Sequence, residues 1–213
     1  MMDINFWLVL CAGMSAVGGG YMITTNSFQM VRSSTIDGAS AGTAISMFSA
    51  CQGLARMFGG LGPDFFGPKH AAKKRPAFLA GFCCVTCCGH LSLFYGASSL
   101  SLFFYYLGYC LAGIGFGGVW PLMVTLSADL WGLEHLGANY MVFDGTSALV
   151  GSLVMGKLLP QAVYAAHTMK GETNCSGSGC FGAAHLMLAS INVVGVLAAI
   201  VLWWRRRRSS GDV

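Results

Sequence analysis

The stretch GYCLAGIGFGGVWPLMVTLSADLWGLEHLGANY, residues 108–140, decides the fold of this chain. It begins as an apolar, glycine-rich helix in which Gly113 and Gly117 are four residues apart. This G-x-x-x-G spacing lets a second helix backbone approach closely inside a bilayer. Pro121 lacks an amide hydrogen and crowds the carbonyl group of Gly117, so a kink is expected there. The stretch therefore predicts a tightly packed membrane helix, followed by a short polar loop.

The overall composition excludes a soluble fold. Of the 213 residues, 55% are apolar and 9% are charged, against about 25% charged in an average soluble domain. A mean hydropathy of +0.64 is typical of an integral membrane protein. The formal net charge of +4 is concentrated in two basic segments, 69–75 and 205–208. Such clusters indicate membrane orientation and contact with the lipid bilayer rather than with nucleic acid.

The nine cysteines do not form an obvious metal site. Most of them lie inside apolar runs, where a cysteine acts as a small buried residue. Cys83, Cys84, Cys87 and Cys88 contain the C-x-x-C spacing found in zinc sites. Their neighbours are apolar, however, and a helix at lipid depth is a poor metal site. We therefore expect no metal and no cofactor.

Six segments are long and apolar enough to cross a bilayer, which needs about 20 residues each. They cover residues 6–25, 39–60, 78–95, 100–126, 140–164 and 181–204. The first segment lacks a basic n-region and a cleavage site of small residues, so we interpret it as a mature helix and not as a signal peptide. The expected fold is an all-α polytopic membrane protein with six transmembrane helices in one bundle, residues 1–208, ending in a basic tail at 205–213.

The distribution of lysine and arginine predicts the orientation of these helices. If the N-terminus is cytoplasmic, the basic segments 69–75 and 205–208, with four Lys or Arg residues each, are cytoplasmic too. The opposite face then carries only Arg32 and Lys170 in its loops. Both termini are therefore expected in the cytoplasm, in a membrane that the sequence does not identify.

Charged residues near the cytoplasmic face are candidates for a latch, meaning a set of charges that holds helices in one conformational state. Arg56 lies near the inner end of the second segment, and Asp64 follows just beyond it. Asp129, in the polar stretch after the fourth segment, is the third candidate. Snorkelling of Arg56 towards the lipid headgroups is an equally good interpretation.

The polar loop 165–180 is assigned to the opposite, outer face. Cys175 and Cys180 lie in this loop, and the glycines between them allow a tight turn. Because cysteines on the outer face can oxidise, we predict a disulfide between them. His90 stands alone on the third segment and is either a hydrogen-bonded packing residue or a proton relay.

Taken together, these features resemble the C-terminal six-helix half of a major facilitator superfamily transporter of the nodulin-like (nuclear-fusion-defective-4-like) family. The motifs that carry the resemblance are DINFW at 3–7, Asn26, Arg56 with Gly59-Gly60 and Asp64, Arg75-Pro76, Gly115-x-Gly117-x-x-Trp120-Pro121, the polar segment 127–140 and the pair Cys175 and Cys180. The chain departs from the family pattern at Gln52 and Ala55, where asparagine and glycine are usual.

The resemblance implies a protein of twelve helices, in which two halves surround a central solute cavity. This chain would supply one half, so its expected partners are a missing N-terminal half or partner chain and an unknown small solute. The implied activity is secondary transport by alternating access. A structural or assembly subunit of a membrane protein complex is the alternative.

An enzyme is not expected. An intramembrane serine protease needs a Gly-x-Ser-Gly nucleophile within a helix, whereas Ser176 and Ser178 lie in the polar loop. Ser147 lies within an apolar segment but lacks the following glycine.

Candidates for the solute path offer either a polar group or a flexible backbone. They are Asn26, Gly113, Gly117, Trp120, Pro121 and Lys157. Asn26 has both a donor and acceptors for a polar solute, and Pro121 frees the carbonyl of Gly117. Lys157 either faces the path or snorkels outward. A purely structural role of these residues in helix packing is the alternative.

Overall fold

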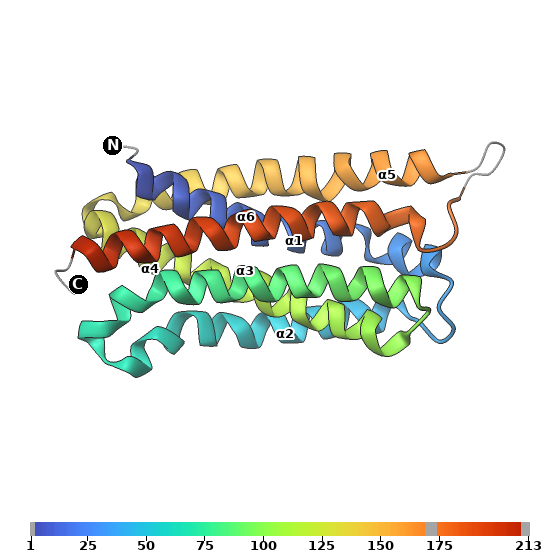
Figure 1. Ribbon diagram of the computed structural model, residues 1–213, viewed down its shortest axis with the longest axis horizontal. Helices are drawn as coiled ribbons and strands as arrows, with labels where there is room; N and C mark the ends of the chain where they lie inside the picture. The colour runs from blue at the N-terminus through green and yellow to red at the C-terminus, as the bar shows by residue number, and fades with distance from the viewer. Residues whose placement is uncertain (1–2, 169–173, 210–213) are drawn as a thin grey trace.

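The computed structural model describes residues 3–168 and 174–209 of the chain and is built from helices that run along one long axis (Figure 1). In chain order they are α1 (Ile4–Ser34), α2 (Ala41–Leu61), the 3-10 helix η1 (Gly62–Phe66), α3 (Pro68–Ser98), α4 (Leu102–Ala148), the π-helix η2 (Leu149–Leu158), α5 (Leu159–His167) and α6 (Gly179–Ser209). No strand occurs within the two described ranges. The predicted all-α class is confirmed.

Four helical segments of the described chain are long and apolar enough to cross a membrane: Ile4–Ser34, Ala71–Ser98, Leu102–His167 and Gly179–Arg208. The third is 66 residues long and joins α4, η2 and α5. In Figure 1 this segment runs to one end of the bundle and then returns. The 21-residue α2 is not among the four, because Gln52, Arg56 and its glycines lower its hydropathy.

The observed helices extend beyond the apolar segments that the sequence predicted. Asp3 caps α1, and its carboxylate accepts a hydrogen bond from the amide of Phe6 at 3.0 Å. At the other end α1 continues through the polar residues up to Ser34. Likewise α6 runs to Ser209, so residues 205–209 of the predicted basic tail are helical, whereas residues 210–213 lie outside the described part. Polar residues near a membrane surface do not end a helix by themselves.

The predicted polar loop between the fourth and fifth segments is also helical, apart from one residue. Gly132 has φ 78° and ψ 166°, which interrupts α4. This conformation is essentially restricted to glycine. A single glycine therefore turns the chain back where the sequence predicted a loop, whereas α4 remains helical through Pro121.

Close glycine contacts fix α4 against α2. A Cβ atom on Gly113 would lie 2.5 Å from the carbonyl oxygen of Phe48, and one on Gly117 would overlap the carbonyl of Gln52. Gly59 on α2 meets the carbonyl of Gly118 in the same way. The G-x-x-x-G spacing thus brings two helix backbones together, as small residues do in membranes.

The two ends of the bundle differ in content. Figure 1 places the N-terminus and the C-terminus at the same end, together with η1, the start of α3 and the Gly132 turn. The opposite end holds the connection from α1 to α2, the short turn from α3 to α4 and the connection from α5 to α6. We call the second of these ends the loop end. Lys170, which the sequence assigns there, lies outside the described residues.

Candidate functional site

An open pocket of about 490 Å³ lies where four parts of the chain meet. Tyr21 comes from α1, Arg56 from α2, and the rest from α4 on either side of Gly132. The lining residues are Tyr21, Arg56, Trp120, Pro121, Val124, Tyr140 and Asp144. We call this cavity the Arg56 pocket.

The Arg56 pocket carries one positive and one negative charge. The side chain of Arg56 is exposed, and Asp144 is half-buried. Among the described residues, no ion pair within 4.0 Å joins the two. Tyr140 is close enough to interact electrostatically with both of them. Charged groups inside a membrane bundle are costly and generally serve function, so the Arg56 pocket is the candidate functional site.

Aromatic rings form the wall of the Arg56 pocket. The ring of Trp120 meets that of Phe116 edge to face at 6.1 Å between centroids. Phe116 in turn contacts Tyr21 at 5.8 Å and Phe48 at 5.8 Å. The indole N–H of Trp120 is buried and has no hydrogen-bond partner in the described structure. These ring contacts tie the wall residues Trp120 and Tyr21 together through Phe116.

The six predicted solute-path residues do not lie together. Trp120 and Pro121 line the Arg56 pocket. Gly113 and Gly117 are buried in the contact between α4 and α2. Lys157 is exposed on η2 and does not line the Arg56 pocket. One face of α4 therefore packs against α2 through the glycines. The adjacent face carries Trp120 and Pro121 and lines the Arg56 pocket.

Asn26 is buried and uses its amide within the protein. Its Nδ2 atom donates to the carbonyl of Gly156 on η2 at 2.6 Å and to the carbonyl of Met22 at 2.8 Å. The hydroxyl oxygen of Thr25 lies 2.9 Å from the same Gly156 oxygen and 2.6 Å from the carbonyl oxygen of Tyr21 on its own helix. The contacts of Asn26 and Thr25 with this carbonyl hold α1 to η2.

A cluster of charges lies at the end of the bundle that holds both termini. Arg75 on α3 donates to Asp129 on α4 at 2.6 Å and to Asp64 on η1 at 3.1 Å. Arg206 on α6 lies 3.8 Å from Asp129. Asp64 and Asp129, two of the three latch candidates, thus share one partner, Arg75, which was not among the candidates. Arg56, the third latch candidate, lies in the pocket instead.

Two buried histidines pair across α3 and α6. The Nδ1 atoms of His90 and His185 are 3.1 Å apart, so one ring donates and the other accepts. A Cβ atom on Gly19 of α1 would lie 2.5 Å from Nε2 of His90. His90 is therefore not alone, as it had seemed in the sequence, since its partner is 95 residues away. Within the described chain, no three His, Cys, Asp or Glu side chains could hold a metal ion.

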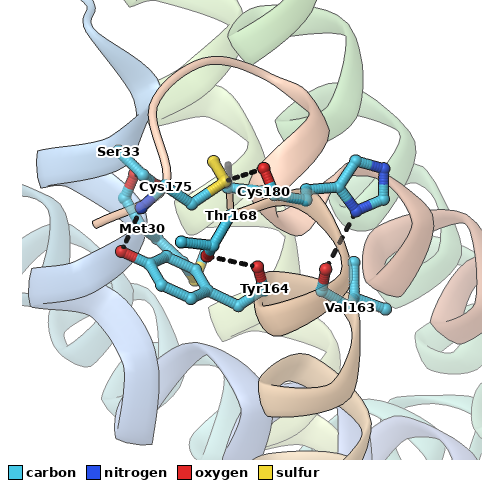
Figure 2. Close-up of a disulfide and its surroundings, with 8 residues drawn as sticks. Met30, Ser33, Val163, Tyr164, Thr168, Cys175 and Cys180 are labelled. Carbon is cyan, nitrogen blue, oxygen red and sulfur yellow. Dashed lines mark hydrogen bonds between the residues drawn. A yellow bond between two sulfur atoms is a disulfide. The ribbon is translucent and has the colours of Figure 1, made fainter. Parts of the chain in front are cut away.

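A second cavity, of about 580 Å³, lies at the loop end, beside the disulfide between Cys175 and Cys180 (Figure 2). The amide of Cys175 donates to the hydroxyl of Tyr164 at 2.9 Å, so the loop is attached to α5. The predicted disulfide is present, with 5.8 Å between the Cα atoms. We call this second space the loop cavity.

Comparison with known proteins links the fold to transport. The chain matches no protein-family model and no solved structure. Over 151 residues it is 27% identical to the probable transporter mch1 of Emericella nidulans, an alignment that covers 68% of this chain and 24% of the relative. It is 24% identical over 217 aligned residues to the probable transporter MCH1 of Yarrowia lipolytica, covering 96% of this chain and 44% of the relative.

The chain therefore spans less than half the length of the curated relatives it matches. Its helices and these similarities define a class, that of multi-pass integral membrane proteins related to transporters.

Proposed function

We propose that this chain is one six-pass half of a secondary transporter that moves a small polar solute by alternating access. The six passes are α1, α2, α3, the two arms of α4 on either side of Gly132, and α6, with η2 and α5 completing the fifth. Termini at the same end of the bundle support an even number of passes (Figure 1).

The partner of this half is a second six-helix bundle, supplied by a preceding part of the same protein or by another chain. The relatives are more than twice as long as the aligned region. The Arg56 pocket is open on one side, and a facing bundle would close it into a central cavity.

The observation that carries this proposal is the pair of uncompensated charges in the Arg56 pocket. The guanidinium of Arg56 offers a planar fork of donors to a carboxylate or phosphate. Asp144 offers acceptors to an ammonium or hydroxyl group. A small polar solute would satisfy both, against the aromatic wall of Trp120.

The Arg75 cluster would serve as the latch of the proposed cycle. Arg75 and Asp129 are largely buried, with 15% and 16% of their side chains exposed, whereas 49% of the Asp64 side chain is exposed. The bond from Arg75 to Asp64 is thus the outermost one. Breaking it would weaken the attachment of η1 to α3, while the buried pair persists.

Solute counterflow in proteoliposomes tests the proposal. The chain is reconstituted with its second half, and pools of amino acids, carboxylates and sugar phosphates are screened. Arg56→Gln and Asp144→Asn should each slow counterflow by about tenfold or more, because a hydrogen bond to a charged group contributes about 1.5–3 kcal/mol.

Arg205→Gln is the matched control, since Arg205 is exposed and bonds to Asn5 far from the pocket. Wild-type counterflow in both pocket variants would contradict a transport role for the Arg56 pocket. Absence of counterflow with every solute pool would instead favour the assembly-subunit alternative, in which these charges have no solute to bind.

A further inference from the structure

The loop cavity is a second polar space, separate from the Arg56 pocket. It is enclosed by the last turns of α1, the end of α5 and residues 174–176 of the connection to α6. Its volume of about 580 Å³ is sufficient for a small organic ion with its water. Nothing in the proposed function so far uses it.

The rim of the loop cavity is held in place by backbone contacts. The amide of Gly177 donates to the carbonyl of Ser33 at 2.7 Å, which attaches the loop to α1. The amide of Cys175 attaches the same loop to α5 through Tyr164 (Figure 2). Gly177 has φ 101°, a left-handed conformation that favours glycine. The disulfide closes this loop, so the rim bridges the outer ends of two passes.

The described residues that line the loop cavity carry one sign of charge. Arg32 is the one charged residue among the described residues that line it. The other polar lining groups are amides and hydroxyls, from Gln29, Asn174, Thr25 and Ser176 among others. No ion pair between Arg32 and a carboxylate occurs among the described residues. Arg32 lies in the last turn of α1, where the helix dipole places a partial negative charge. That charge is about half an elementary charge, so the full charge of the guanidinium outweighs it.

We propose that the loop cavity is an anion-selecting vestibule, in which Arg32 attracts a carboxylate or phosphate group and the disulfide loop forms the rim. Its anion preference rests on the cavity alone. Its place on the solute path rests on the proposed function, as follows.

The two cavities share one face of α1. Tyr21 lines the Arg56 pocket and Thr25 lines the loop cavity, and these residues are one helical turn apart. Gln29 and Arg32 continue the same face towards the loop end. An anion held at Arg32 would therefore lie on the route along α1 towards Arg56.

Cysteine reactivity measures the anion preference without knowledge of the solute. In the Gln29→Cys variant, in opened membranes, we compare the labelling rates of two methanethiosulfonates, an anionic sulfonatoethyl and a cationic trimethylammonioethyl reagent. Each rate is divided by the rate of the same reagent with a free thiol in solution. The normalised ratio should favour the anionic reagent by roughly tenfold, as expected for one nearby charge in a partly screened site.

Removal of the charge provides the decisive comparison. Arg32→Gln in the Gln29→Cys background should bring the ratio close to one, and Arg32→Lys should keep it in favour of the anion. Ser99→Cys, on an exposed turn at the same end, is the control, and its ratio should not respond to Arg32→Gln. A ratio at Gln29→Cys that is the same with and without Arg32→Gln would overturn the proposal.

The rim is tested by replacing both Cys175 and Cys180 with serine in the Gln29→Cys background. Freeing the loop should raise both labelling rates and leave the anion preference in place. Unchanged rates would show that the loop is not the rim. A preserved anion preference in a chain that fails the counterflow test would contradict the proposed transport function and not the vestibule.

Discussion

At the scale of single residues, the carbonyl of Gly156 explains why a buried asparagine is present on α1. A bilayer offers no water to a buried carbonyl, so protein donors must satisfy it. Asn26 and Thr25 approach it from the neighbouring helix at 2.6 and 2.9 Å. The sequence alone allows a polar solute contact for Asn26, and the structure gives its amide a protein partner.

We predict that Asn26→Leu destabilises the protein by about 1 kcal/mol, because interhelical hydrogen bonds in membranes contribute on that order. Thermal unfolding in detergent measures the loss. Thr24→Val is the matched control, since the Thr24 hydroxyl bonds only to the Tyr21 carbonyl of its own helix. Equal stability of the two variants would show that the contact with Gly156 contributes nothing.

Long-range partners are the part of the site that the sequence could not supply. The two acids Asp64 and Asp129 are visible as candidates, yet nothing local indicates that Arg75, 54 residues before Asp129, joins them. His90 and His185 are even further apart, at 95 residues. Cys175 and Cys180 were predictable as a pair, because both lie in the polar loop assigned to the outer face and glycines between them allow a tight turn.

At the scale of elements, glycines bring the backbones of α2 and α4 into direct contact. We predict that Gly117→Ala destabilises the protein by about 1–3 kcal/mol, because the added methyl group would overlap the Gln52 carbonyl and separate the two helices. Unfolding of the purified protein in mixed micelles measures this. Gly53→Ala on α2 is the control, since its Cβ would meet nothing within 4 Å. That variant should be neutral or slightly stabilising.

The apolar runs predicted where most helices lie, but not where they end. The third predicted segment, 78–95, became α3 over Pro68–Ser98, since a proline in the first turn starts a helix readily. Its basic residues therefore belong to a helix, not to a loop. Hydropathy reports burial in lipid, and a helix extends beyond the lipid wherever its backbone groups remain bonded.

At the scale of the whole molecule, the two ends of the bundle should lie on opposite sides of a membrane. The arginine-rich end of α6 and the start of α3 lie at the end that holds both termini (Figure 1). Positive charge favours the cytoplasmic side. Phe65→Cys at this end should resist impermeant reagents applied outside intact cells, whereas Asp37→Cys at the loop end should react.

Permeabilised cells serve as the control, because the reagent then reaches both sides of the membrane and both positions should react. Labelling of Phe65→Cys but not Asp37→Cys in intact cells would reverse the orientation and move the disulfide loop to the cytoplasm.

Gly132 has a consequence for the genetics of this protein. The φ and ψ angles of Gly132 disfavour every residue that has a Cβ atom. Space is not the reason, since a Cβ there would meet nothing within 4 Å. No single-nucleotide change of a glycine codon yields another residue that tolerates such torsion angles. In a saturation-mutagenesis library, codon 132 should therefore be depleted of every replacement. Codons 137 and 145, whose glycines are equally uncrowded but have ordinary torsion angles, should accept alanine. Selection would then retain glycine at position 132 because the turn requires its torsion angles.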